Sequence, residues 1–136
     1  MDWAALTTWI LTATGGVSML AIWLKNGGLR QRGRGVIRSV AILTHFALAS
    51  TGLVLWALYV ATGTTALAWA AFLVLIVVAS IGFAMLNLWL GQRSRVEPPV
   101  AEPAERHFPT LIVSFHGTLA ATTLVLVFLT TAGVGV

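Results

Sequence analysis

Two histidines stand inside long apolar stretches of this chain, where an ionisable side chain is unusual. His45 lies in a stretch from about residue 36 to 61, and His116 lies in one from about residue 110 to 132. An imidazole can ligate a metal, carry a proton or hydrogen-bond to a neighbouring helix. Because ionisable residues within membrane-spanning helices usually face a bundle interior or a cavity, both histidines are candidates for a functional site.

The elements that carry them belong to a set of four apolar segments. Of the 136 residues, 58% are hydrophobic and only 9% are charged, which is too little polar surface to cover a soluble core. A membrane-spanning helix needs about 20 apolar residues, so four helices with short connections occupy nearly the whole chain. We therefore expect one all-α membrane domain over residues 1–136. It should be a four-transmembrane-helix up-down bundle with spans of about 3–24, 36–61, 66–90 and 110–132.

The eight basic residues fall in only two of the three connections: Lys25, Arg30, Arg32, Arg34 and Arg38 in the first, and Arg93, Arg95 and Arg106 in the third. Loops rich in Lys and Arg stay on the cytoplasmic side of a membrane. This distribution predicts a multi-pass protein whose termini are both extracytoplasmic. Since the positive charge is confined to one membrane face, the expected partner is membrane lipid and not nucleic acid.

The two histidines are expected to lie at equal depth on facing helices. At about 1.5 Å per residue, His45 lies about 12 Å above the start of its helix and His116 about 10 Å above the start of its own. The second and fourth helices of such a bundle lie across a diagonal, with axes about 11 to 14 Å apart. Two imidazoles that share one iron need Cα atoms on the order of 12 Å apart. The spacing therefore favours one haem b, with His45 and His116 as axial ligands and no metal other than its iron.

Small residues flank both histidines at helical spacing, as a flat macrocycle requires: Ala41, Ala49, Gly52, Gly117, Ala120 and Thr123. Arg34 and Arg38 lie toward the cytoplasmic side, where we expect them to contact haem propionates. Thr44 or a backbone carbonyl is expected to accept the second imidazole proton.

Two other interpretations explain the same residues. In the first, each histidine hydrogen-bonds a carbonyl or hydroxyl of a neighbouring helix, or the two rings meet directly, and the small residues serve close packing. In the second, the histidines have a proton or quinone function. The third histidine, His107, stands in the polar linker beside Arg106 and is expected to be a solvated residue at the membrane boundary.

Other chemistry is excluded by what the chain lacks. The absence of cysteine excludes disulfides, iron–sulfur clusters, thiolate zinc sites and covalently attached haem. Apart from Arg38 at the cytoplasmic edge of the second span, the predicted spans contain no acidic residue, lysine or arginine, which argues against a proton- or cation-coupled exporter. The linker glutamates Glu97, Glu102 and Glu105 are expected to be solvated, without a rigid partner for acid–base work. We therefore expect no catalytic residue and no autonomous enzyme activity.

Tryptophans mark the expected membrane boundaries. Trp3, Trp56 and Trp69 fall toward the outer one, and Trp23 and Trp89 fall toward the inner one, so these five are expected to anchor the helices at the interfaces. Trp9 does not fit this pattern.

Two stretches near the end of the chain, residues 105–110 (ERHFPT) and 115–127 (FHGTLAATTLVLV), carry a resemblance to known proteins. They resemble the last helix of small four-helix membrane proteins of high-GC Gram-positive bacteria that have no assigned function. This resemblance implies a bacterial inner (cytoplasmic) membrane. In architecture the chain is also similar to four-helix membrane cytochromes b, whose haem irons are held by histidines on facing helices. That resemblance implies His45 and His116 as the axial pair and, without four such histidines, a single haem.

Together these features predict an accessory or anchor subunit of a larger, respiratory membrane complex that carries one bis-histidine haem b or no cofactor. Its partners would be other membrane subunits or further copies of the chain. The alternative is a self-associating, holin-like membrane protein with structural histidines and no cofactor, because glycines in the first, second and fourth spans can drive oligomerisation.

Overall fold

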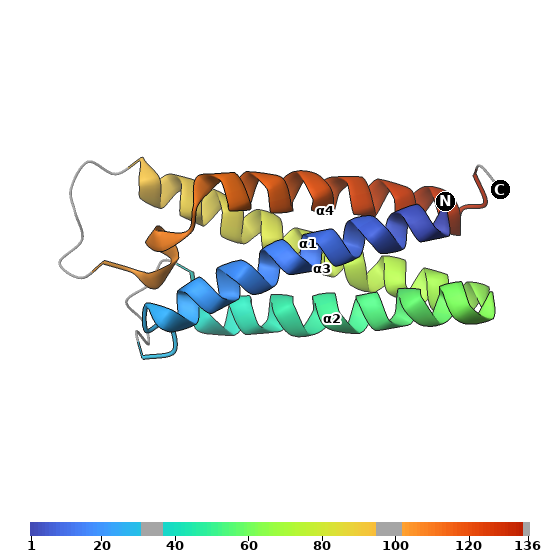
Figure 1. The fold of residues 1–136 in the computed structure, drawn as a ribbon, viewed down its shortest axis with the longest axis horizontal. Coiled ribbons are helices and arrows are strands. Elements are labelled where there is room, and N and C mark those ends of the chain that lie inside the picture. Colours follow the sequence, from blue (N-terminus) through green and yellow to red (C-terminus); the bar gives the residue numbers. More distant parts are fainter. Residues whose placement is uncertain (31–36, 95–101, 135–136) are drawn as a thin grey trace.

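The computed structural model describes residues 1–30, 37–94 and 102–134. Its elements are four long helices and one short 3₁₀ helix, in the order α1 (Asp2–Lys25), α2 (Ser39–Thr62), α3 (Thr65–Arg93), η1 (Ala104–His107) and α4 (Thr110–Thr131) (Figure 1). Each of the long helices is long and apolar enough to cross a membrane. The expected all-α, four-helix architecture is confirmed to that extent.

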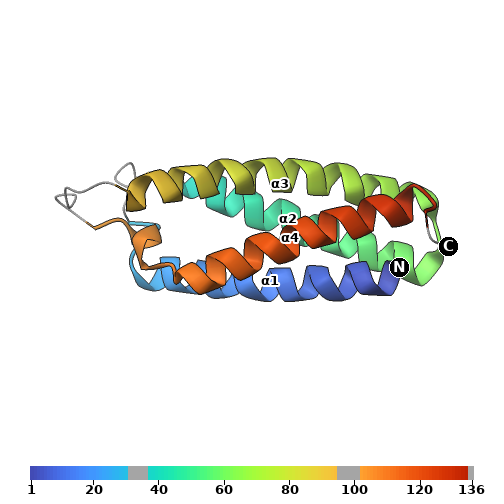
Figure 2. The same ribbon diagram turned by 90° about the horizontal axis from the view of Figure 1, so that it is seen from above.

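The helices alternate in direction and are adjacent in chain order around the bundle. α1 packs most extensively on α4 and α2 on α3, and these two pairs meet over smaller seams between α1 and α2 and between α3 and α4. Across the diagonals, no described Cα atom of α1 lies within 8 Å of α3, nor one of α2 within 8 Å of α4. Figure 2 shows the same up-down arrangement from above. The two histidine-bearing helices are therefore diagonal, as expected.

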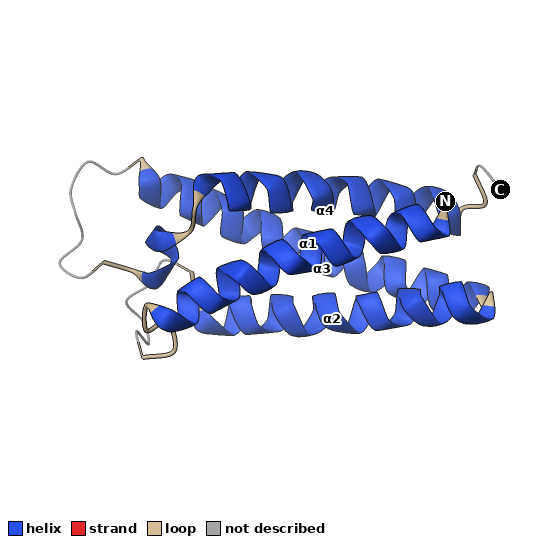
Figure 3. Cartoon of the chain, viewed as in Figure 1, coloured by secondary structure: helices blue, strands red, loops and turns tan. Residues whose placement is uncertain are grey.

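Two ends of the bundle are named here by their residues. The start of α1, the turn at Gly63 and the end of α4 form the terminal end, and the opposite end, which carries Lys25 and Arg93, is the basic end (Figure 3). α2 stops at Gly63, whose φ of 70° is the left-handed conformation that glycine adopts readily at a helix C-terminus. The turn to α3 is thus tight, and α2 and α3 become neighbours.

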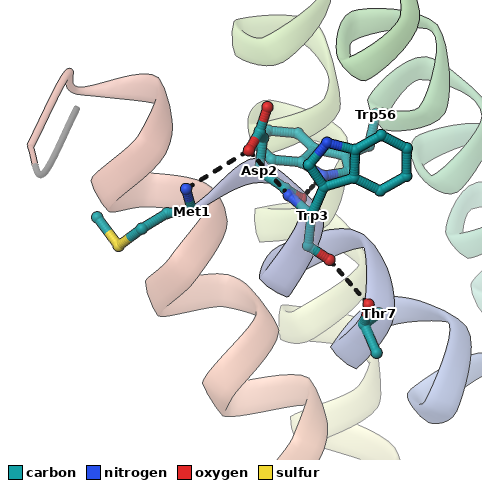
Figure 4. Close-up of polar contacts among 5 residues, drawn as sticks. All are labelled: Met1, Asp2, Trp3, Thr7 and Trp56. Carbon is teal, nitrogen blue, oxygen red and sulfur yellow. Dashed lines mark hydrogen bonds and ion pairs between the residues drawn. The ribbon is translucent and has the colours of Figure 1, made fainter.

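The buried core lies toward the terminal end and consists of Ala5, Trp9, Trp56, Ala68, Ala71, Leu75, Val78 and Val127. Gly52 makes room for the indole of Trp9, because a Cβ atom at Gly52 would lie 2.9 Å from Trp9 Cζ2. The indole N–H of Trp56 donates to the carbonyl oxygen of Asp2 at 3.2 Å, which ties the end of α2 to the start of α1 (Figure 4). This end of the bundle is closed by large side chains.

The prediction that tryptophans anchor the helices at the membrane boundaries is wrong for Trp23, Trp56 and Trp89. These side chains are at most 3% exposed, and only Trp3 and Trp69 of the predicted anchors project outward. The indoles are buried because they point into the interior near the two ends of the bundle. Trp56 and Trp89 also satisfy their N–H groups on backbone carbonyls, as buried indoles must.

A small cap closes the basic end, where η1 packs against α1 and α3. Glu105, in η1, is 1% exposed, and its Oε1 accepts the backbone N–H of Ile37 at 3.2 Å. Its carbonyl oxygen accepts the indole N–H of Trp89 at 3.1 Å. The expectation that Glu105 is solvated is therefore wrong, because η1, which carries it, packs against α1 and α3. Glu102 is exposed as expected, and Glu97 lies outside the described residues.

We predict that Glu105→Ala lowers the free energy of unfolding in detergent by about 1–3 kcal/mol, the cost of leaving a buried backbone N–H without its acceptor. Glu102→Ala is the matched control, since Glu102 is exposed and its ion pairs with Arg106 and His107 are long. Unfolding by a denaturing detergent, followed by circular dichroism, measures both. Equal stability of the two variants would contradict the cap described above.

Candidate functional site

The two histidines of the long apolar helices meet in the bundle interior. His45 follows the start of α2 at Ser39 by six residues, and His116 follows the start of α4 at Thr110 by the same number. Because both helices rise from the basic end, the rings come to the same level. Their centroids are 6.3 Å apart, with ring planes inclined by 60°. The predicted meeting of the two side chains across the diagonal is confirmed.

Each ring is held by a backbone carbonyl of the helix beside it. His45 Nδ1 lies 3.1 Å from the carbonyl oxygen of Val78 in α3, and His116 Nδ1 lies 2.8 Å from that of Thr12 in α1. A carbonyl oxygen only accepts, so each Nδ1 carries the proton and donates it. In a neutral imidazole the remaining nitrogen, Nε2, then has a free lone pair. Of the two predicted acceptors, the backbone carbonyl is the one used, and Thr44 is exposed.

Glycines give the imidazoles access to these carbonyls. In an α-helix the carbonyl of Val78 faces residue 82, and the carbonyl of Thr12 faces residue 16. Both positions are glycine, and a Cβ atom there would lie 3.0 Å from His45 Cε1 at Gly82 and 3.3 Å from His116 Cε1 at Gly16. A side chain at either place would displace the ring, so these glycines position the site.

The helix segments around the rings contain half-buried and exposed residues only. We call residues 13–22, 39–51, 79–88 and 110–122 the histidine layer, and none of its side chains is fully buried. Buried residues resume on both sides, at Gly52 and Thr123 toward the terminal end and at Trp23 and Trp89 toward the basic end. Ten residues of helix span about 15 Å. The fully buried residues of the described chain therefore lie on either side of the histidine layer, and the two rings are half-buried between them.

The two halves of the site repeat one another in sequence. Residues 45–58 (HFALASTGLVLWAL) and 116–129 (HGTLAATTLVLVFL) are identical at 8 of 14 positions, and His45 aligns with His116. Residues 13–24 (ATGGVSMLAIWL) and 79–90 (ASIGFAMLNLWL) are identical at 6 of 12 positions. In the second alignment Gly16 pairs with Gly82, and Trp23 pairs with Trp89. The first helix hairpin, α1–α2, thus corresponds to the second, α3–α4.

This internal repeat also relates the contacts. The bond from His45 to Val78 has its counterpart in the bond from His116 to Thr12, with donors and acceptors at aligned positions. Burial follows the same rule: Trp23 and Trp89 are both buried, as are Trp56 and Val127. The repeat can be read in the sequence, and it shows that Thr12 and Val78, like Gly16 and Gly82, occupy equivalent positions of the two hairpins.

For the other described residues that the sequence analysis assigned to the site, the structure shows no hydrogen bond to the imidazole rings. Arg38 is the exposed N-cap residue of α2, and Arg34 lies outside the described residues. The expectation that Gly117 flanks the site is wrong, because Gly117 is exposed and a Cβ atom there would meet nothing within 4 Å. Ala41, Ala49 and Ala120 are half-buried within the histidine layer. Gly52 and Thr123 belong to the packed core beyond it.

The two imidazoles could supply a metal with two protein ligands. Among residues 1–30, 37–94 and 102–134, no three histidine, cysteine or acidic side chains are grouped so that they can hold an ion. Two imidazoles supply only two ligands, as axial ligation of a metal macrocycle requires. Metal–nitrogen bonds of about 2 Å, with about 1 Å from each nitrogen to its ring centre, place such a pair about 6 Å apart. The observed 6.3 Å between centroids fits this arrangement.

Comparisons of the chain with protein-family models, with curated proteins and with solved structures found no match.

Proposed function

We propose that this chain is a membrane-embedded subunit that binds one b-type haem between His45 and His116. The observation that carries the proposal is the pair of rings 6.3 Å apart at one level on diagonal helices. Each ring has its Nδ1–H committed to a carbonyl, which leaves Nε2 as the metal-binding atom. No described side chain of the histidine layer is fully buried, which is compatible with a large flat ligand at this level.

In this proposal the haem, when bound, supplies one-electron chemistry at its iron. The chain's own residues hold and tune the site. The carbonyls of Val78 and Thr12 fix the tautomer and the orientation of the imidazoles and raise the basicity of Nε2. Trp23 and Trp89 close the site toward the basic end, and the core around Trp9 and Trp56 closes it toward the terminal end, so both separate it from water.

We further propose that the basic end faces the cytoplasm of a bacterium and that the chain is an accessory or anchor subunit of a respiratory membrane complex. The charge at this end supports that orientation, since Lys25, Arg30, Arg38, Arg93 and Arg106 all lie there. Arg38, at the start of α2, is well placed for anionic lipid headgroups. The short connections offer little surface for an active site, which supports a carrier or anchor role over autonomous catalysis.

A second candidate is a structural role for the histidines in a self-associating membrane protein without cofactor. The bonds from His45 to α3 and from His116 to α1 favour it equally, because they tie helices together whether or not a ligand is present. Interhelical hydrogen bonds of this kind contribute about 0.6–2 kcal/mol each in membranes.

The absorption spectrum of the purified full-length protein separates the two candidates. We expect a reduced-minus-oxidised spectrum of the b type, either as isolated or after titration with haemin, that saturates at one haem per chain. A folded, helical preparation that stays colourless and binds no haemin would overturn the haem proposal and leave the structural one.

A further inference from the structure

We infer that the chain is two copies of one helix hairpin, related by a pseudo-two-fold axis that runs between the two imidazoles. We also infer that Gly16 and Gly82 are equivalent positioning residues for a ligand on that axis. The identity of the ligand rests on the proposed function, whereas the equivalence of the two halves does not.

The pseudo-two-fold axis follows from which helices pack together. Under the alignment α1 corresponds to α3 and α2 to α4, so the α1–α4 contact must correspond to the α3–α2 contact. These are the two extensive contacts, and the two smaller seams, α1–α2 and α3–α4, also correspond to each other. If the two hairpins were similar in sequence but not related by an axis, the α1–α4 and α2–α3 contacts would not need to be equally extensive.

Each hairpin completes the half-site of the other. His45 of the first hairpin bonds the second hairpin at Val78, and His116 of the second bonds the first at Thr12. The glycine beside each ring likewise belongs to the opposite hairpin: Gly82 contacts His45, and Gly16 contacts His116. An imidazole is therefore always positioned by the hairpin that does not carry it.

This arrangement specifies the class of ligand. A ligand centred between equivalent imidazoles must present the same chemistry to both, and a metal at the centre of a flat tetrapyrrole does so on its two faces. Each histidine is also bonded within its own extensive helix pair, α2–α3 or α1–α4. The ligand would consequently join the two pairs, which otherwise meet over the smaller seams.

Three glycines in contact with the rings give a graded test in the full-length protein. A Cβ atom at Gly82 would lie 3.0 Å from His45 Cε1, and one at Gly16 would lie 3.3 Å from His116 Cε1, so in both cases the ring must shift. A Cβ atom at Gly15 would lie 3.5 Å from His116 Cβ, which is an ordinary van der Waals contact. We expect Gly82→Ala and Gly16→Ala each to weaken haemin binding by about 10–100-fold, as loss of ligand orientation usually does. Gly15→Ala is expected to bind as wild type does.

Gly91→Ala and Gly117→Ala are the matched controls, since both are helical glycines at which a Cβ atom meets nothing within 4 Å. Wild-type affinity in both Gly16→Ala and Gly82→Ala, or a loss in only one of them, would overturn the inference. If Gly82→Ala fails to give helical, monodisperse protein, the haemin affinities of the milder Gly16→Ala and of the Gly15→Ala control still test the inference.

A second experiment tests the equivalence of the two half-sites without haem. In the unliganded protein, nitrogen NMR of the histidine rings should show that Gly82→Ala shifts the His45 resonances and that Gly16→Ala shifts those of His116. If the wild-type protein binds no haemin while these paired shifts appear, the proposed function fails and the equivalence of the two half-sites stands. Shifts that are absent, or that appear on the other histidine, would refute the equivalence.

Discussion

Replacement of either His45 or His116 by alanine is expected to abolish the b-type absorption of the purified protein. The reason is that in the proposed site each imidazole would supply one of the two protein ligands of the iron, and the ring centroids are 6.3 Å apart with no third ligating group nearby among the described residues. His107→Ala is the matched control: this histidine lies in η1, outside the four long helices, 4.0 Å from Glu102. It should leave the reduced-minus-oxidised spectrum unchanged.

The same variants test the structural alternative through stability. Without a ligand, His45→Ala removes one interhelical hydrogen bond to Val78 and is expected to cost about 0.6–2 kcal/mol of unfolding free energy. With haem bound, the wild type gains additional stability in proportion to the haem affinity, and both histidine variants lose it. Equal haem content in wild type and in both variants would show that any bound haem lies elsewhere.

Disruption of the contact between Gly52 and Trp9 should lower stability as much as loss of the Glu105 cap does. A Cβ atom at Gly52 would lie 2.9 Å from Trp9 Cζ2, 3.0 Å from Trp9 Cη2 and 3.3 Å from Val74 Cγ1, all within the packed core. Gly52→Thr is therefore expected to lower the free energy of unfolding by about 1–3 kcal/mol through overpacking. Gly117→Ala, in open space on α4, should change it little.

The internal repeat indicates which second substitution should restore the stability that Gly52→Thr loses. Thr123 and Leu75 occupy the positions of the second hairpin that align with Gly52 and Trp9. The double variant Gly52→Thr, Trp9→Leu should therefore recover much of the stability that Gly52→Thr loses, because the smaller side chain vacates the space that the new one needs. Detergent denaturation of the single and double variants forms a double-mutant cycle. Additive losses would mean that the two hairpins do not pack equivalently.

The close approach of the two histidines could be predicted because it depends on local quantities. Helix rise per residue fixes depth, and His45 and His116 stand at the same distance from the starts of their helices. Short connections make consecutive helices antiparallel neighbours, which puts α2 and α4 on a diagonal. Four apolar helices of spanning length follow from composition and segment length alone.

The residues that hold the rings could not be assigned from spacing, because they belong to other helices. Which carbonyl accepts each Nδ1 depends on the rotation of α1 and α3 about their own axes, and glycine periodicity within one helix does not reveal it. Gly117 illustrates the difficulty: it adjoins His116 in the chain but is exposed, whereas Gly82 and Gly16 are distant in the chain and touch the rings. The repeat between the hairpins carries part of this information.

The sequence by itself determined four apolar helices, a basic end and two imidazoles at one level, since composition, charge position and helix rise are properties of single segments. Only the tertiary structure decided that Trp23, Trp56 and Trp89 are buried, that Glu105 is buried as well, and that each histidine bonds the opposite hairpin. The physical reason is that burial and hydrogen-bond partners depend on how helices rotate and fold back against one another. That rotation is set by side chains on several helices at once, so no single segment specifies it.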